Sequence, residues 1–176
     1  MRVTPLVAAA LVLAACAPKP ETPEQAAARM KAQADTARTA ISAANARFSR
    51  YLAAGQMDSA ALNYAEDAVF YPANMPAVRG QAAIRTLLRN WGAAGAWQVT
   101  PKTLSVEANG PLAIETGSAI IVFTPGLNAP PEMKTASTDT VKYVTTWRKT
   151  GGQWLISNDI STTDRAAQPA PAKKRR

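Results

Sequence analysis

The chain has 176 residues, a length that suits one compact domain with tails. It has no histidine and one cysteine, Cys16, which excludes histidine-bound zinc, Ser-His-Asp triads, Cys-His dyads and disulfides within the chain. The net charge of +8 comes largely from the ends, because without Arg2 and residues 173–176 fifteen basic residues face twelve acidic ones. We therefore expect a nearly neutral domain with no nucleic-acid partner, no cofactor and no metal.

Residues 1–15 have the pattern of a secretory signal peptide, in which Arg2 precedes an apolar run too short to span a bilayer. Residues 13–16, Leu-Ala-Ala-Cys, resemble the bacterial lipobox. We predict that Cys16 is lipidated and anchors the protein to a membrane; the alternative is an ordinary signal peptide with an incidental cysteine. Ala17 is not the aspartate that retains lipoproteins in the inner membrane of enteric bacteria. An outer-membrane lipoprotein facing the periplasm is expected.

A Pro-rich tether at residues 16–22 leads into a long predicted helix, residues 23–54. Thr22 is expected to cap this helix, with proline at its first position and Gln25 closing a capping box. The second half of the helix has an apolar face that is expected to pack on a core, formed by Ile41, Ala44, Phe48 and Leu52, with Tyr51 beside it.

Shorter elements are expected next. Asp58 is a predicted N-cap for a helix over residues 59–65, and a short strand at 68–71 ends at Pro72. A third helix is predicted over residues 81–91.

The second half of the chain has strand character. Strands are predicted at residues 97–108, 112–124, 138–149 and 153–162. Helices followed by antiparallel strands indicate an α+β domain, residues 23–164, in which a curved sheet wraps around the helices. Residues 165–176 have the composition of a disordered basic tail, either solvated or in contact with anionic lipid.

Four motifs follow one another in this domain. Ala-Gly-x-x-Asp occupies residues 54–58, Tyr-Ala-x-Asp-Ala-Val 64–69 and Arg-Gly-x-x-Ala-Ile-Arg 79–85, and residues 145–161 form the last hairpin. In this order they resemble the nuclear transport factor 2-like superfamily, especially its SnoaL-like and uncharacterised bacterial branches. The resemblance implies a cone, in which a bent antiparallel sheet closes over three helices around an open pocket, and a homodimer through the outer sheet face. Some members are enzymes and many only bind, so the fold does not give the activity.

The catalytic positions of the ketosteroid isomerases in this superfamily are vacant here. Alignment on the motifs places their oxyanion-hole tyrosine at Phe48, their general-base aspartate at Pro72 and their second aspartate at Thr145. None of these side chains supplies the base or the acidic donor that the isomerase reaction needs. Dehydratases of the superfamily rely on histidine, which the chain lacks. The resemblance therefore favours a protein without this chemistry.

Asp67 is the acidic residue in the second motif. We expect it to hold the turn between helix and strand through backbone N–H groups rather than to act as a catalytic acid. Arg79 and Arg85 are expected to pair with Glu66 or Asp67 as structural or surface contacts.

Alternation along the last two strands selects the pocket residues. Asn158 shares the apolar face of its strand, so it is expected to point inward, where it either satisfies local backbone groups or contacts a ligand, and Asp159 is expected to point outward. Tyr143 and Thr145 share a face of the neighbouring strand and are candidates to line the same cavity. The remaining candidate ligand contacts are aromatic and are equally compatible with a simple core: Tyr51, Phe48, Phe70, Trp91 and Trp97.

The long connection over residues 125–138 is a candidate lid, because long loops in compact domains tend to be functional or disordered. The function that we expect from the sequence is non-catalytic binding of a small, mostly apolar ligand or a protein partner by a lipid-anchored domain. A cyclase- or isomerase-like enzyme and an envelope scaffold acting through the sheet face and basic tail remain as alternatives.

Overall fold

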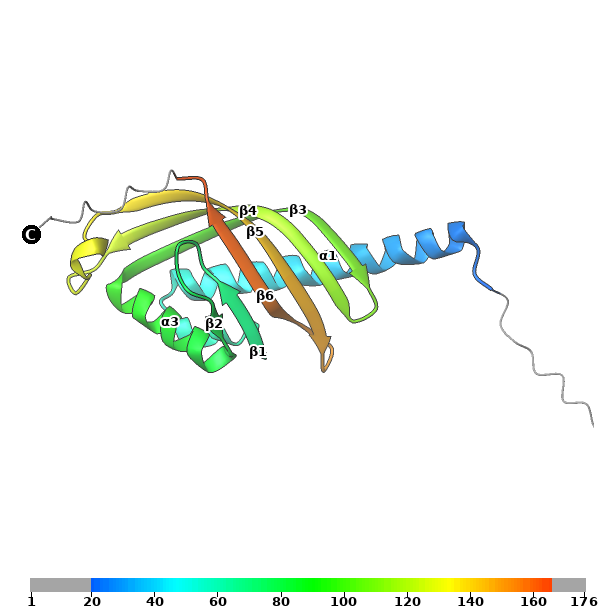
Figure 1. The fold of residues 1–176 in the computed structure, drawn as a ribbon, viewed down its shortest axis with the longest axis horizontal. Coiled ribbons are helices and arrows are strands. Elements are labelled where there is room, and N and C mark those ends of the chain that lie inside the picture. The colour runs from blue at the N-terminus through cyan, green and yellow to red at the C-terminus, as the bar shows by residue number, and fades with distance from the viewer. Residues whose placement is uncertain (1–19, 166–176) are drawn as a thin grey trace, which may run out of the picture.

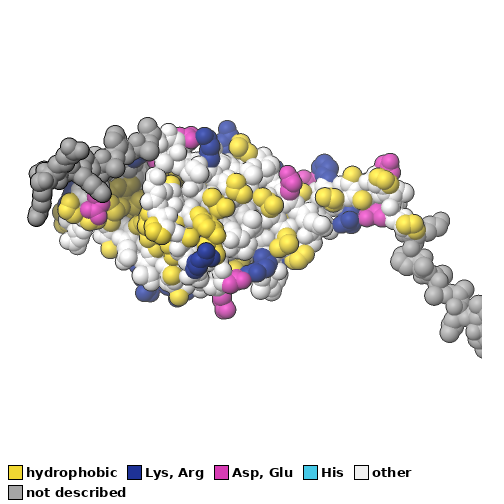
Figure 2. Space-filling model, in the orientation of Figure 1, with side chains coloured by type: hydrophobic (Ala, Val, Ile, Leu, Met, Phe, Trp, Pro, Cys, Tyr) yellow, Lys and Arg dark blue, Asp and Glu magenta, His cyan; other side chains and the backbone are white. Residues whose placement is uncertain are grey.

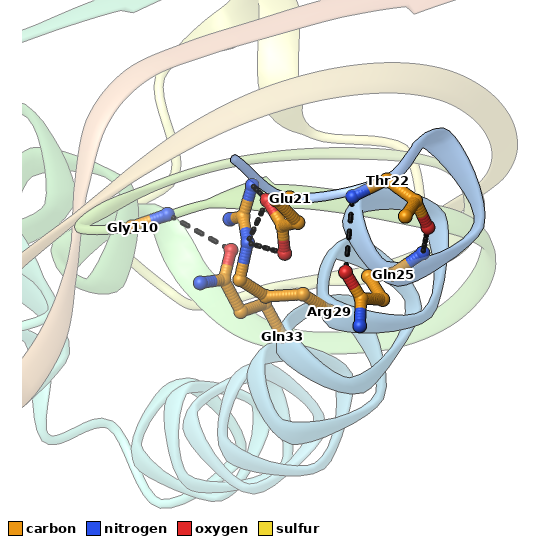
Figure 3. A network of polar contacts seen from close by, with 6 residues as sticks. All are labelled: Glu21, Thr22, Gln25, Arg29, Gln33 and Gly110. Atoms are coloured by element: carbon orange, nitrogen blue, oxygen red, sulfur yellow. Dashed lines mark hydrogen bonds and ion pairs between the residues drawn. The ribbon is translucent and has the colours of Figure 1, made fainter. Parts of the chain in front are cut away.

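The long first helix, α1 (Pro23–Ala53), runs beneath a curved sheet in the computed structural model, which describes residues 20–165 (Figure 1). Its N-terminus is capped as predicted, since Thr22 Oγ1 accepts from the backbone N–H of Gln25 while the Gln25 side chain accepts from that of Thr22 (Figure 3). The N-terminal half of the helix projects beyond the sheet. One polar contact ties it to the domain, because Gln33 Oε1 accepts from the backbone N–H of Gly110 at 3.2 Å.

The sheet has six strands in the order β2-β1-β6-β5-β4-β3. Neighbouring strands are antiparallel except β1 and β6, which are parallel, so the sheet is mixed rather than wholly antiparallel as expected. The strand bounds are β1 (Tyr64–Tyr71), β2 (Val78–Arg79), β3 (Gly95–Asn109), β4 (Leu112–Pro125), β5 (Ser137–Thr150) and β6 (Gln153–Thr163). The limits of the four long strands lie within two residues of those predicted.

The short second helix differs from its prediction. It is α2 (Met57–Ala61), with Gln56 at the N-cap position, and Asp58 lies in its first turn and pairs instead with Arg89 of α3 (Gln81–Ala94). The chain enters the sheet early because the Asn63 carbonyl accepts from the backbone N–H of a residue in β6 at 2.8 Å. As a consequence β1 begins at Tyr64, a residue that was predicted to lie in the second helix.

The partners expected for the acidic motif are also wrong. Asp67 lies inside β1 rather than in a turn, and its exposed carboxylate pairs with Arg148 of β5. Arg85 donates to Gln81 Oε1 at 3.1 Å, within α3.

The connection between β4 and β5 contains a short 3-10 helix, η1 (Pro131–Met133). It folds on itself, with Lys134 Nζ donating to the Leu127 carbonyl at 3.1 Å. Only Ser137, at the start of β5, contributes to the wall of the cavity described below. The connection is therefore not a lid in this conformation. No helix within residues 20–165 is long and apolar enough to cross a membrane.

Candidate functional site

A cavity of about 360 Å³ lies between α1, α3 and the concave face of the sheet. Its volume is within the range of small-molecule sites in proteins. Four of the predicted aromatic residues line it: Phe48, Phe70, Trp91 and Trp97. Trp91 and Trp97 stack with ring centroids 5.4 Å apart, and the Trp97 indole N–H donates to the Trp91 carbonyl at 2.8 Å. These rings leave the cavity open rather than filling it.

Tyr51, also predicted to line the cavity, lies outside its lining and packs against the core.

On the surface, apolar side chains are densest towards the end of the domain that lies away from the free end of α1 (Figure 2).

A β-bulge in β6 decides which polar residues enter the cavity. Trp147 pairs with Ile156 and Thr146 pairs with Asn158, so Ser157 is an extra residue on the β6 side. Ile156 faces inward, and the extra residue shifts the alternation so that Asp159 lines the cavity. Asn158 lies off the cavity and donates to Thr146 Oγ1 at 2.9 Å. The predicted orientations of Asn158 and Asp159 are therefore both wrong.

Asp159 is a titratable group held inside an apolar cavity. Its Oδ2 accepts a hydrogen bond of 2.7 Å from the hydroxyl of Tyr64, which is only 1% exposed. Burial raises the pKa of Asp159 to about 6, with the charge of Glu115 adding to the rise, while hydrogen bonds from Tyr64 and Thr145 oppose it. Burial, and then the charge of Asp159, raise the pKa of Tyr64 well above its usual value, so its hydroxyl remains a donor.

A second carboxylate, Glu115 of β4, lies behind the cavity wall and is fully buried. Four neutral side chains donate to it. Oε1 accepts from Asn45 Nδ2 at 2.8 Å, Thr103 Oγ1 at 2.6 Å and Tyr143 Oη at 2.9 Å, and Oε2 accepts from Trp147 Nε1 at 3.1 Å. Buried carboxylates are tolerated when hydrogen bonds replace their hydration.

Tyr143 and Thr145 lie where the strand alternation places them, on the cavity wall. Thr145 pairs with Glu115 on one side and with Asp159 on the other, so the two acids stand in one row across three strands. The Tyr143 ring lies directly over Gly117, where a Cβ atom would collide with it. The absent side chain at Gly117 is what allows the tyrosine hydroxyl to reach Glu115.

Helix α1 supplies two polar wall residues, Asn45 and Ser49, one turn apart. The Ser49 hydroxyl is buried and has no hydrogen-bond partner among residues 20–165. A buried polar atom without a partner costs stability, so a bound ligand is a natural partner for it.

An ion pair stands at the cavity wall near the end of β6. Arg165 Nε lies 3.4 Å from Asp139 Oδ1, and Thr163 Oγ1 donates to Asp139 Oδ2 at 2.7 Å. Asp139 and Arg165 both line the cavity. Residue 165, assigned to the tail by composition, is therefore part of the site, whereas the remaining tail, the predicted tether before residue 20 and Cys16 lie outside the described residues.

The three isomerase-like positions, Phe48, Pro72 and Thr145, all lie on the cavity wall and none is an acid or base. The acids at the site, Glu115, Asp139 and Asp159, are not among the predicted pocket residues. Glu115 could have been found, because it shares an inward face of β4 with small residues such as Ala113 and Gly117. No comparable pattern marks the bulge that turns Asp159 inward.

Comparison with solved structures supports this architecture. A nuclear transport factor 2-like protein with a cystatin-like fold from Novosphingobium aromaticivorans has a TM-score of 0.61 and 17% identity, covering 83% of this chain and 92% of its own. A Mycobacterium tuberculosis protein of unknown function has a TM-score of 0.63 and 19% identity, covering 74% and 73%. A ketosteroid isomerase-like protein from Erwinia carotovora atroseptica has a TM-score of 0.62 and 12% identity, covering 73% and 96%. Identities this low establish the fold alone.

Comparison with functionally curated proteins gives no match. The SnoaL-like domain family matches residues 33–158, which include Glu115 and most of the cavity wall and end one residue before Asp159. The chain therefore belongs to the SnoaL-like domain family, within the nuclear transport factor 2-like fold.

Proposed function

We propose that the domain binds a small, mostly apolar molecule in the cavity and transfers a proton on it through Asp159. One observation carries the proposal, namely a carboxyl group with a pKa of about 6 that lines an apolar cavity. A general base works best when its pKa lies near the working pH, because it is then both ionised and basic. Strongly perturbed acids in cavities are candidates for catalytic groups.

A proton transfer needs a free carboxyl oxygen. The Tyr64 hydroxyl donates to Asp159 Oδ2, so in this proposal the other oxygen, Oδ1, takes the proton from the ligand. Once protonated, Asp159 is neutral and compatible with its buried surroundings, so it can return the proton to another atom of the same molecule. The aromatic walls would hold a flat substrate and exclude water from it.

Non-catalytic binding is the second candidate, favoured by the absence of an acid at the isomerase-like positions Phe48 and Pro72. The ketosteroid isomerase-like name of one similar structure belongs to that protein and does not decide between the two.

Nitrobenzisoxazole, a small flat molecule, separates these candidates. A base removes its ring C–H proton, the electron pair forms a nitrile, the N–O bond breaks and a coloured phenolate is released. We expect the protein to accelerate this elimination with a rate that rises with pH around a midpoint near 6, as Asp159 ionises. The variant Asp159→Asn should lose the acceleration while the exposed control Asp35→Asn keeps it. Binding of the probe with no elimination that depends on Asp159 would refute the catalytic proposal and support non-catalytic binding.

We also propose that the domain is held at the periplasmic face of a bacterial outer membrane through lipidated Cys16. The support is the lipobox-like sequence alone. Expression of the full chain with a click-reactive fatty acid should label the protein, and Cys16→Ser should abolish both the label and membrane sedimentation. Equal labelling of the two proteins would refute the anchor.

A further inference from the structure

The hydrogen bonds around Glu115 have a defined direction. Asn45 Nδ2 and Trp147 Nε1 can only donate, and they contact different oxygens of Glu115, at 2.8 and 3.1 Å. Both oxygens of the carboxyl group therefore act as acceptors, as in a carboxylate. The hydroxyls of Thr103 and Tyr143 complete a shell of four donors directed away from the cavity and towards Glu115.

This direction determines what two wall residues offer to a ligand. Tyr143 has one hydroxyl proton and donates it to Glu115, so only its oxygen lone pairs remain for the cavity. Burial and the charge of Glu115 raise the pKa of Tyr143, which keeps that proton in place. Asn45 turns its amide nitrogen to Glu115, which leaves its carbonyl oxygen as the group available to the cavity.

Asp159 adds further acceptor oxygens to the same wall, one strand beyond Thr145. The Tyr64 proton is already committed to Asp159. Asn45 on α1, Tyr143 on β5 and Asp159 on β6 thus present acceptors to the cavity.

We infer that Glu115 makes the polar wall of the cavity a set of hydrogen-bond acceptors, so that its ligand is a flat apolar molecule carrying a hydrogen-bond donor, such as a phenol, an alcohol or an amine. The inference rests on the proposed ligand-binding role of the cavity and specifies the substrate class. A ketone, which can only accept, would face unpaired lone pairs on this wall.

Other polar groups of the wall are compatible with such a ligand. The Ser49 hydroxyl, which has no partner within residues 20–165, and the hydroxyls of Ser137 and Ser161 can either donate or accept, so a ligand hydroxyl satisfies both possibilities. Arg165 is a donor, and two of its nitrogens are directed at protein acceptors, Nε at Asp139 and Nη2 at the Thr138 carbonyl.

Three probes that share one ring system test the inference. β-Naphthol carries a donor, its methyl ether has lost that donor, and methyl β-naphthyl ketone presents an acceptor. We expect β-naphthol to bind the full chain at least about tenfold more tightly than either of the others, measured by calorimetry, since hydrogen bonds to charged acceptors are strong. Equal affinities, or tighter binding of the ketone, would overturn the inference while leaving the ligand-binding role of the cavity intact.

Two cavity variants test which residues cause the preference for β-naphthol. Tyr143→Phe keeps the ring and removes an acceptor, so the preference for β-naphthol should fall, and Glu115→Gln should shift it towards the ketone because the donors are released. Tyr71→Phe is the matched control, since Tyr71 is half-buried and lies outside the cavity wall. An unchanged preference in both cavity variants would overturn the role of Glu115.

A measurement without ligand tests the orientation itself. Proton NMR should show a nuclear Overhauser contact between the Asn45 side-chain amide and the Tyr143 hydroxyl proton, because both donate to Glu115 Oε1. Absence of this contact would refute the proposed direction of the hydrogen bonds. If none of the three probes binds, both this inference and the proposed ligand-binding role are refuted.

Discussion

Replacing Asp159 with asparagine should stabilise the folded protein at neutral pH. The folded-state pKa of about 6 lies above the usual value of 3.8, so the folded protein binds this proton more tightly than the unfolded chain does. Protonation of Asp159 therefore contributes favourably to the free energy of unfolding in acid. This contribution is lost as the pH rises from about 4 to about 6, so wild type is destabilised above that range. Asparagine resembles the neutral carboxylic acid and avoids the loss.

The size of the effect follows from the two pKa values. A tenfold change in a protonation equilibrium corresponds to about 1.4 kcal/mol, so a rise from 3.8 to about 6 corresponds to at most about 3 kcal/mol. Because asparagine can still accept from the Tyr64 hydroxyl, the interaction seen at 2.7 Å is not removed outright. We therefore expect Asp159→Asn to raise the free energy of unfolding by about 1–3 kcal/mol at about pH 7.5 and to change it little at about pH 4.

Urea denaturation of wild type, Asp159→Asn and the exposed control Asp35→Asn at both pH values measures this difference. The control side chain is 62% exposed, so its substitution should have a small effect. A difference between Asp159→Asn and wild type that is the same at both pH values would refute the assignment of Asp159 as a destabilised buried acid. A variant less stable than wild type at neutral pH would refute it as well.

Three further changes test the surroundings of the site. Gly117→Ala should cost about 1–3 kcal/mol in urea unfolding, because the new methyl group would collide with the Tyr143 ring and with the Lys102 carbonyl; a neutral effect would show that neither group is held there. Deletion of Ser157 removes the bulge but keeps Asp159 on the inward face, so carboxyl-carbon NMR should still give Asp159 a pKa near 6; a return to about 3.8 would contradict the register. Val144, 40% exposed on the outer face of the sheet, is expected to lie in a homodimer interface, so Val144→Glu should convert a dimer to a monomer in light scattering; a monomeric wild type would reject the dimer.

The sequence predicts the fold well where the determining interactions are local. Thr22 and Gln25 form the predicted capping box, and the period of four that places Ile41 on the buried face of α1 is visible in the residues themselves. The long strands and the tight turn at residues 151–152 are equally local, because alternation and paired glycines mark them.

The candidate site was predicted less completely because it depends on contacts across strands. Alternation assumes a period of two, and one unpaired residue at Ser157 is enough to exchange the orientations expected for Asn158 and Asp159. The start of β1 at Tyr64 depends on a hydrogen bond to β6, far along the chain, which no local pattern shows. Tyr64 was therefore missed as the partner of Asp159.

The domain has the nuclear transport factor 2-like fold, but its buried acids do not occupy the isomerase-like positions. The positions that would carry the isomerase groups, Phe48 and Pro72, are apolar, and the two buried acids lie on the strands either side of Thr145. An isomerase-like site requires donors where an oxyanion forms, but the donors around Glu115 are directed away from the cavity. A proton transfer in this cavity therefore suits a ligand that gives up a proton to a carboxylate wall better than one that needs a carbonyl oxygen stabilised.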